Sequence, residues 1–468
     1  MTTTDSPSLT DTAASPRTTS PADAPVALTH RSGRWIDGWN AENATFWLGE
    51  GRAIARRNLG WSIFAEFLGF IIWQLWSIVV VMLPAAGFQL TSSESFWLIS
   101  LPSLVGATLR FPYTFMVAIF GGRNWTIVSA GLLLIPAVLL GIVVSNPETP
   151  FGVLLLVAAL GGVGGGNFAS SMANITYFFP QKEKGWALGL NAAGGNLGAS
   201  VAQFVVPIVI TIGAGAALNL PLAGWVWVPL ILVAMWGAFR YMDNLSNAKA
   251  DFAGSAAALK EPHLWIMSVL YIGTFGSFIG FASVFPKLLA DQFPEFSTIA
   301  VGGASVGLAF LGALVGSLAR PYGGRLSDRF GGARITMVAF AAMGALALAV
   351  MLTLPVANFW LFLGLFLLLF ASAGIGNGST YRMVPIVFAL RASGDETARK
   401  RKAAAALGLI SAIGAYGGFL IPQALNLSFQ ASGGYAGAFL GFVAVYAFLL
   451  VLTYVVYVRS ARLSAHKI

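Results

Sequence analysis

Twelve apolar runs, each long enough to cross a lipid bilayer, constrain the fold of this chain more than any other feature of its sequence. A transmembrane helix requires about 20 predominantly apolar residues. The runs lie at about residues 61–84, 95–120, 125–144, 151–179, 186–212, 223–241, 263–289, 299–327, 334–354, 357–390, 403–427 and 434–458. We therefore expect an all-α membrane protein with 12 transmembrane helices, arranged as two bundles of six.

The composition agrees with a membrane protein and argues against several other classes. Charged residues make up 10% of the 468 residues, whereas soluble domains carry roughly 25%. Cysteine is absent and there are three histidines, His30, His263 and His466, so we expect no disulfide and no metal site. We also find no nucleophile–base pair or cofactor motif and expect neither an enzyme nor a cofactor. We attribute the net charge of +9 to Lys and Arg in cytoplasmic loops, rather than to a nucleic-acid-binding surface.

Polar segments divide the chain into five parts. Residues 1–58 are predicted to form a cytoplasmic tail, disordered to about residue 34, because they begin with a segment rich in Thr, Ser and Pro. Residues 59–241 and 263–458 are predicted to form the two six-helix bundles. Residues 242–262 form a cytoplasmic linker and residues 459–468 a second cytoplasmic tail.

The distribution of positive charge predicts the orientation. Lys and Arg are concentrated in the tails and in the even-numbered connections, such as Arg325, Arg329 and Arg334, whereas the odd-numbered connections carry Lys287. Cytoplasmic loops carry the excess of Lys and Arg. We therefore expect a multi-pass protein of the inner (cytoplasmic) membrane with both termini in the cytoplasm, and we expect a monomer.

The two predicted bundles repeat one another in sequence. Arg110-Phe-Pro-Tyr in the second run resembles Arg320-Pro-Tyr in the eighth, 210 positions later, and each arginine precedes a Gly-Gly pair by eleven positions. Ala187–Leu190 of the fifth run matches Ala406–Leu409 of the eleventh. Because helix order is kept, these are parallel repeats, the plan of major facilitator transporters, with the substrate site between the halves near the membrane midplane. The segment Gly323–Gly332 also resembles the cytoplasmic loop motif of that superfamily.

Arg110 and Arg320 are the strongest candidates for a ligand site. Each is predicted to lie roughly 15 Å from the cytoplasmic end of its helix, near the midplane, where an arginine is costly unless it faces a cavity or a partner. The acid inside a predicted span, Glu66, is expected close to the cytoplasmic end of the first helix. The pair therefore predicts an anion site, with structural ion pairing or snorkelling as the alternatives. The planar guanidinium fork favours planar or phosphate-like oxyanions.

Other polar residues in the spans admit two interpretations. Asn167, Asn174, Asn191, Asn196 and Asn377 need partners in an apolar medium, and each either hydrogen-bonds a neighbouring helix or binds the ligand; Asn191 is the best ligand candidate. The glycines around them favour close helix packing. Outside this group, Tyr271 is either a core residue or a hydroxyl donor, and Arg382 is predicted to snorkel to the interface.

Four segments together resemble the nitrate/nitrite porter family, NarK type, of the major facilitator superfamily. They are Gly166–Asn174, Gly374–Thr380, His263–Ser268 and Phe275–Phe281. The resemblance extends over nearly the whole chain from Trp39 onward.

This resemblance implies a role for each candidate. Arg110 and Arg320 would clasp nitrate or nitrite, Tyr271 and Asn191 would donate hydrogen bonds, and Phe168 and Phe275 would sandwich the plane of the anion. The glycines that would let gating helices bend are Gly164, Gly166, Gly374 and Gly376.

The expected function is nitrate/nitrite exchange by rocker-switch alternating access. Two like charges make closure of an empty site costly, so the loaded carrier is expected to reorient. The first alternative is nitrate/proton symport, for which Glu66 and His263 are the candidate proton-carrying groups. A nitrate sensor and a passive anion channel are further alternatives. The expected partners are the two anions and the lipid bilayer.

Overall fold

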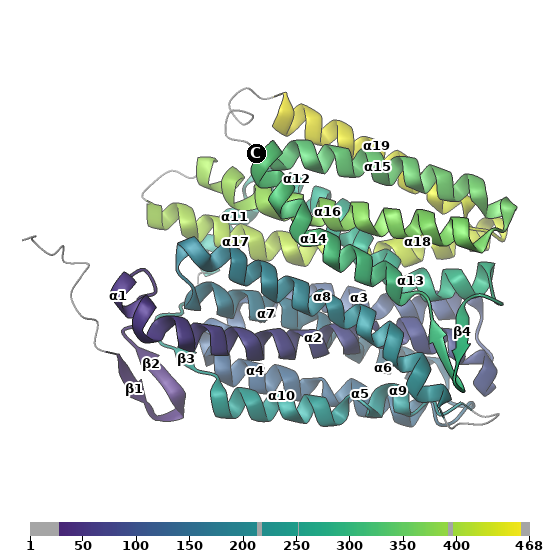
Figure 1. The fold of residues 1–468 in the computed structure, drawn as a ribbon, viewed down its shortest axis with the longest axis horizontal. Helices are drawn as coiled ribbons and strands as arrows, with labels where there is room; N and C mark the ends of the chain where they lie inside the picture. The colour runs from purple at the N-terminus through teal and green to yellow at the C-terminus, as the bar shows by residue number, and fades with distance from the viewer. Residues whose placement is uncertain (1–27, 213–217, 251, 392–395, 460–468) are drawn as a thin grey trace, which may run out of the picture.

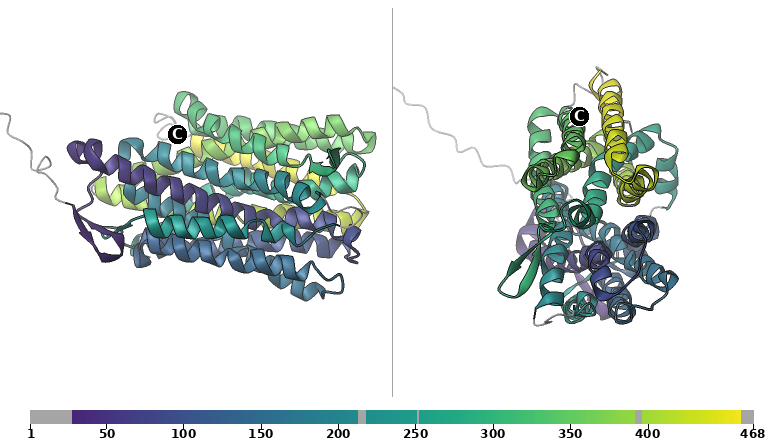
Figure 2. Two further views of the ribbon diagram at one scale, coloured as in Figure 1. Left: turned by 60° about the horizontal axis from the view of Figure 1, so that its bottom comes forward. Right: turned by 90° about the vertical axis from the view of Figure 1, so that its right-hand side faces the viewer.

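The computed structural model describes residues 28–212, 218–250, 252–391 and 396–459, and these form two helical bundles lying side by side (Figure 1). The predictions for residues 1–27 and for the tail from residue 460 lie outside the described residues. Within the described ranges, one bundle is built from the first half of the chain and the other from the second half, and the elongated molecule has its helices along one direction (Figure 2).

The first bundle contains six spans, three of them interrupted. The first follows α1 (Ala44–Phe46) and a π-helical turn (Trp47–Gly51). The six spans are α2 (Arg52–Met82), α3 (Ser92–Phe120), α4 with α5 (Gly122–Leu132, Leu134–Val143), α6 with α7 (Phe151–Gly161, Val163–Phe178), α8 (Gln181–Thr211) and α9 with α10 (Leu222–Trp225, Val228–Tyr241).

The second bundle follows the linker helix α11 (Phe252–Leu259). Its spans are α12, a π-helical turn and α13 (Pro262–Tyr271, Ile272–Gly276, Ser277–Gln292), α14 (Phe310–Phe330), α15 (Gly332–Thr353), α16 (Phe359–Arg391), α17 with α18 (Glu396–Gly414, Gly417–Ser432) and α19 with a final π-helical turn (Ala436–Thr453, Tyr454–Val458).

The predicted fold of two six-helix bundles is confirmed in the described part of the chain. Eleven helical segments there are long and apolar enough to cross a membrane. The twelfth is α14, whose 21 residues include Arg320, Arg325, Asp328 and Arg329, and it packs against α16, α15 and α8 inside the assembly. These charged residues make α14 less apolar than the other spans. Its place in the bundle is nevertheless that of a span.

The predicted run at 299–327 is wrong at its beginning. Residues Thr298–Val301 (β4) and Ala304–Gly307 (β5) form an antiparallel hairpin, and the helix starts at Phe310. Gly302 and Gly303 connect the strands with φ of 56° and 82°. Two residues with positive φ are what a tight hairpin turn requires, so Gly-Gly between short apolar segments predicts a turn rather than a helix.

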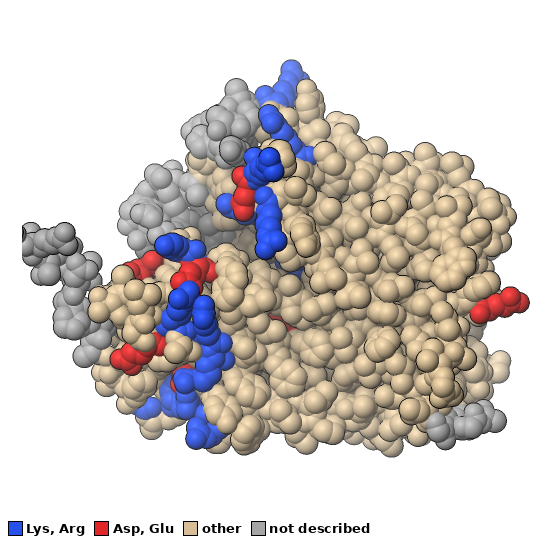
Figure 3. Space-filling view, viewed as in Figure 1, with Lys and Arg blue, Asp and Glu red and all other residues tan. Residues whose placement is uncertain are grey.

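A small sheet at one end of the molecule ties the N-terminal segment to the linker. β2 (Trp35–Asp37) pairs with both β1 (Thr29–Arg31) and β3 (Asn244–Leu245). Residues 29–34 are therefore ordered, contrary to the prediction of disorder to about residue 34. We call this the terminal end and the opposite one the far end; Lys and Arg gather towards the terminal end on the face shown in Figure 3.

Hydrogen bonds join the two bundles between the site and the far end. The Gln203 amide donates to the carbonyl of Ala282 (2.7 Å), and the Gln423 amide donates to the hydroxyl of Ser100 (2.7 Å). These contacts connect α8 to α13 and α3 to α18, so the bundles are held together towards the far end.

Candidate functional site

Arg110 lies on α3 at the boundary between the bundles and is fully buried. Its Nε donates to the carbonyl of Gly165 (3.0 Å) in the first half. Its Nη1 donates to the carbonyl and the hydroxyl of Ser411 in the second half, both at 3.1 Å. The guanidinium carbon lies 4.5 Å from the ring centre of Phe168 and 5.1 Å from that of Phe275. Arg110 is therefore fixed by backbone and hydroxyl acceptors from both bundles.

Arg320, the repeat-related arginine, lies on α14 in a different environment. It is 6% exposed, and its guanidinium carbon is 5.4 Å from the ring centre of Tyr381 on α16. It also interacts electrostatically with Tyr271 on α12 and with Arg110. The structure thus brings the two predicted arginines together across the bundle boundary, in agreement with the repeat.

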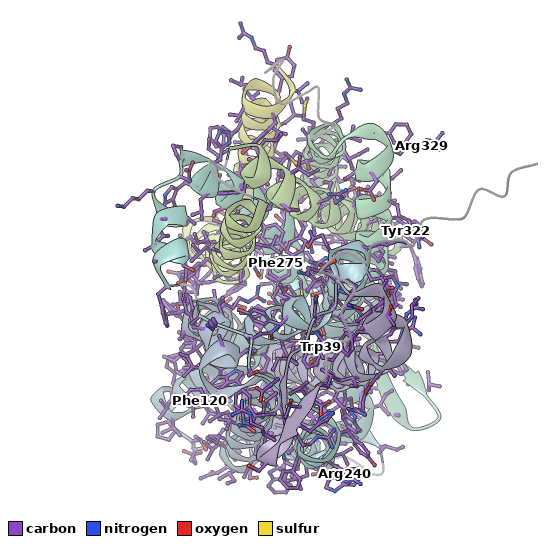
Figure 4. The ribbon with its side chains drawn as sticks, turned by 90° about the vertical axis from the view of Figure 1, so that its left-hand side faces the viewer. Trp39, Phe120, Arg240, Phe275, Tyr322 and Arg329 are labelled. Carbon is purple, nitrogen blue, oxygen red and sulfur yellow. The ribbon has the colours of Figure 1, made fainter. Side chains whose placement is uncertain are left out.

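Phe168 and Phe275 face one another from opposite bundles. Their ring centres are 6.2 Å apart and their planes differ by 24°. Figure 4, viewed from the terminal end, places Phe275 where the two bundles meet. An anion between the rings needs about 3.5 Å on each side, or about 7 Å in total. The rings must therefore separate slightly to sandwich a planar anion.

One span presents two aromatic residues to the site, Tyr271 and Phe275, because residues four positions apart share one face of a helix, and the π-helical turn Ile272–Gly276 lies at this place. The wider turn follows Tyr271 and contains Phe275, and the two rings stack with centres 5.3 Å apart. π-Helical turns are rare and frequently occur at functional sites, because they rotate the side chains that follow.

Glu66 is at the site rather than near the end of its helix, so its predicted position is wrong. The first helix begins at Arg52, nine residues before the apolar run, which places Glu66 about 21 Å along the helix. Glu66 is fully buried and interacts electrostatically with Arg110 and Arg320. Its Oε2 accepts a hydrogen bond from the Asn191 amide.

Asn191, the best asparagine candidate, is held by neighbouring polar groups. Its amide nitrogen lies 2.7 Å from the Ser171 hydroxyl, which in turn lies 3.0 Å from the Asn191 carbonyl oxygen. Asn191 is therefore brought to the arginine pair, but its amide already donates to Glu66. A bound anion would have to share or replace that contact.

Several buried polar atoms around the arginines have no hydrogen-bond partner among the described residues. They include Arg110 Nη2, Arg320 Nη1, Tyr271 Oη and Glu66 Oε1. A buried donor without an acceptor costs about 1–3 kcal/mol, and such atoms in a native protein point to a ligand or water. Three of these four atoms are donors, so the arrangement can bind an anion.

The four predicted gating glycines lie where helices approach closely. A Cβ atom on Gly164 or Gly374 would meet the carbonyl oxygen of Gly69 or Gly316, respectively. On Gly166 it would be 2.9 Å from the ring of Tyr113, and on Gly376 it would be 2.8 Å from Thr274. Packing accounts for glycine at each position. Their role as hinges stays a prediction, although the helix break at Gly162, between α6 and α7, lies next to Gly164.

Two further predicted residues lie away from the arginine pair. His263 is at the terminal end of α12, about 12 Å before Tyr271, and its Nδ1 is 3.0 Å from the Tyr457 hydroxyl. Arg382 is not a snorkelling residue without a partner: its Nε donates to Asp328 at 2.6 Å. Asp328 belongs to the loop motif, so Arg382 anchors that motif to α16.

The sequence alone does not single out Ser171, Tyr381 and Ser411, which complete the site. Ser171 lies inside the Gly166–Asn174 motif, and Tyr381 directly follows the Gly374–Thr380 motif. Ser411 carries no such signal, because its contact with Arg110 depends on how the two bundles pack.

A buried cationic site between two repeated six-helix bundles is typical of the major facilitator class of membrane transporters. The model of the Major Facilitator Superfamily matches residues 65–422. The chain is also similar in fold to a solved structure of a mutant form of the nucleoside transporter NupG. The TM-score is 0.59 and the sequence identity 12%, over 85% of this chain and 99% of that one.

Comparison with known sequences identifies a family within this superfamily. The chain is 43% identical to the nitrate/nitrite transporter NarU of Escherichia coli (strain K12), over 90% of this chain and 96% of that protein. It is 38% identical to the probable nitrate/nitrite antiporter NarK2 of Thermus thermophilus, over 92% of this chain and 98% of that protein. The chain belongs to the nitrate/nitrite porter family, NarK type, of the major facilitator superfamily. This is a family of transporters and not of enzymes.

Proposed function

We propose that this protein transports nitrate and nitrite across the cytoplasmic membrane, by exchange and through alternating access. The observation that carries the proposal is the arginine pair: two buried guanidinium groups from repeat-related helices, each with a nitrogen that has no partner among the described residues. Relatives named as nitrate/nitrite transporters and antiporters support the choice of substrate.

The ligand geometry favours a small planar anion. Arg110 and Arg320 each offer a planar donor fork, which matches an oxyanion. The Tyr271 hydroxyl is a third buried donor. Phe168 and Phe275 are near-parallel, so after a small separation they can cover both faces of a flat ion. Nitrate and nitrite are both planar, so one site can bind either.

In alternating access, the hydrogen bonds that join the two bundles towards the far end belong to one state of the transport cycle. Hydrogen bonds such as Gln203 to Ala282 hold the far side together and would break when the site opens there. Gly164, Gly166, Gly374 and Gly376 would let α7 and α16 bend during that change. Such coupled closure and opening favours a carrier over a passive channel.

The orientation and the oligomeric state belong to the same proposal. We infer that the terminal end is cytoplasmic, because Lys and Arg gather there (Figure 3) and positive charge is retained in the cytoplasm. We also infer that the monomer is the transporting unit, since the site is formed within one chain.

Nitrate/proton symport is the second candidate function, and the position of Glu66 favours it. A membrane-embedded carboxyl group beside the substrate can carry a proton, and Glu66 interacts with both arginines. His263 is the weaker candidate, because it lies near the terminal end and contacts Tyr457.

Uptake into proteoliposomes tests the proposal. Vesicles containing the purified protein are loaded with nitrite or left empty, and nitrate uptake is measured with and without an inward proton gradient. Exchange predicts uptake that requires internal nitrite or nitrate and does not respond to the gradient. Concentrative uptake into empty vesicles, driven by the gradient, would instead establish symport.

A further inference from the structure

We propose that the first bundle binds an anionic phospholipid in a groove between α2 and α10 at the terminal end. The inference goes beyond the proposed function and does not depend on it, because the groove lies on the outer surface of the bundle and not between the two bundles.

The groove has positive charge at one end and apolar walls along its length. Its volume is about 540 Å³, and it is lined by Arg56, Arg57, Gly60, Trp61 and Phe64 of α2 and by Val233 of α10. The two arginines lie in the first two turns of α2, which begins at Arg52. Phe64 lies about 12 Å further along the helix than Arg56. The two ends of the groove therefore match the two parts of a phospholipid, the phosphate headgroup and the acyl chain.

The spacing of residues along α2 produces this groove. Arg56, Gly60 and Phe64 are four positions apart and share one face of the helix. Gly60 leaves the middle of this face open, since a Cβ atom added there would meet no atom within 4 Å. Trp61 forms the adjacent wall, and its ring stacks on that of Tyr241 of α10, with the ring centres 5.7 Å apart and the planes 4° apart. The groove is therefore already formed by packing between the two helices.

The arginines carry positive charge that the nearby acid does not fully neutralise. Arg57 pairs with Asp243 at 2.7 Å, but Arg34 pairs with the same carboxylate, also at 2.7 Å. Arg56 is exposed, lies 6.0 Å from the ring centre of Trp186, and forms no ion pair in the part of the chain that the structure describes. The groove therefore keeps net positive charge, which complements an anionic headgroup. A zwitterionic headgroup would instead bring its own cation beside the arginines.

Aromatic residues place the charged end of the groove at the membrane surface. Trp236 packs edge-on against Tyr241, with the ring centres 5.5 Å apart, so it joins the stack of Tyr241 on Trp61. Trp and Tyr are enriched at the level of the headgroups, and Lys and Arg gather towards this end (Figure 3). Val233 is 45% exposed and lies about 12 Å along α10 from Tyr241. The apolar walls of the groove are therefore at the depth of the acyl chains.

Native mass spectrometry of the purified protein tests the inference. The protein in detergent is titrated with phosphatidylglycerol or with phosphatidylcholine of the same acyl chains, and the lipid bound to each protein is counted. The variants are Arg56→Gln, which removes the unpaired charge, and Gly60→Leu, which fills the open middle of the groove and keeps both arginines. Arg329→Gln is the matched control, since Arg329 is exposed on α14 outside the groove and loses the same charge.

The expected results separate the headgroup from the acyl chain. Wild type and Arg329→Gln should bind one phosphatidylglycerol about tenfold or more tightly than phosphatidylcholine, because each of two arginines attracts the anionic headgroup. Arg56→Gln should weaken phosphatidylglycerol binding by about fivefold and leave phosphatidylcholine binding nearly unchanged. Gly60→Leu should weaken the binding of both lipids, since the acyl chain no longer enters the groove.

Three outcomes would overturn the inference. The first is equal binding of the two lipids by wild type. The second is unchanged phosphatidylglycerol binding in a variant that elutes as folded protein; if Gly60→Leu does not fold, Arg56→Gln decides. The third is displacement of the bound lipid by inorganic phosphate at constant ionic strength, which would assign the groove to free phosphate. Lipid binding is measured without transport, so a failure of nitrate uptake would affect the proposed function alone.

Discussion

The two halves of the molecule present the same arginine in unlike surroundings. In the first half, Arg110 is bonded to Gly165 and, across the boundary, to Ser411. In the second half, Arg320 lies over the ring of Tyr381 and keeps Nη1 without a partner among the described residues. One guanidinium is thus held by hydrogen bonds to both bundles, whereas the other lies against an aromatic ring, and each keeps one nitrogen without a partner among the described residues.

The difference extends to the residue that each half places beside the pair. The first half contributes a carboxylate, Glu66, where the second contributes a phenol, Tyr271. The repeat has therefore kept the two arginines and changed the residue that lies beside them in each half. A pseudo-symmetric site can in this way bind one ligand while its halves do different work.

The largest effect is expected when either arginine of the pair is replaced. Arg110→Lys and Arg320→Lys should each reduce nitrate exchange by about a hundredfold or more, because an ammonium lacks the planar fork. Arg110→Lys should also lower the melting temperature more than Arg320→Lys, since it alone loses bonds to Gly165 and Ser411. Exchange assays with thermal unfolding check both points; wild-type exchange rates in either variant would contradict the assignment.

A second prediction compares Gly195, which faces Glu66, with Gly414, which faces Tyr271. Gly414→Ala brings a methyl group against the rigid ring of Tyr271, within 3.1 Å of Cγ and 3.2 Å of Cβ, and should cost about 1–3 kcal/mol of stability. Gly195→Ala meets the side chain of Glu66 instead, which has more rotatable bonds than the ring of Tyr271, and should cost less. Thermal unfolding of the two purified variants measures the difference. A larger loss for Gly195→Ala would mean that Glu66 is the more rigidly held residue.

A third prediction concerns the contact that fixes Arg110 across the boundary. Ser411→Ala removes the hydroxyl acceptor but keeps the carbonyl of residue 411, so we expect a loss of about 1 kcal/mol, seen as a several-fold lower exchange rate. Ser432→Ala, on an exposed helix end, is the control. An unchanged rate would show that the Ser411 hydroxyl is not needed to position Arg110.

The smallest effect is expected on the Arg320 side. Tyr381→Phe keeps the ring beneath the guanidinium and removes a hydroxyl, so exchange should change by less than about twofold. Tyr381→Leu, which removes the ring, should have the larger effect. Equal losses in the two variants would assign the hydroxyl, rather than the ring, to substrate binding.

The sequence predicted much of the fold because bilayer spans have a strong signal. Apolar length predicted twelve spans, including the run at 299–327 that contains α14, and the repeat around Arg320 supported this one, although α14 is less apolar than the eleven other spans of the described residues. The hairpin of β4 and β5 was not predicted because its residues belong to an apolar run, although Gly302-Gly303 favours a turn. The early helix start at Arg52 was missed because polar residues can extend a span beyond the membrane, and this misplaced Glu66.

By itself, the sequence determined which residues must be costly to bury and where they repeat. Arg110 and Arg320 stand out because a charge in an apolar helix is costly, and their spacing put them in equivalent helices. Only the tertiary structure decided what each one touches, since Ser411, Asn191 and Glu66 reach the pair through contacts between helices that lie far apart in sequence. Hydrophobic patterning fixes which segments span the membrane, but the charge balance of the site depends on the packing of those segments against one another.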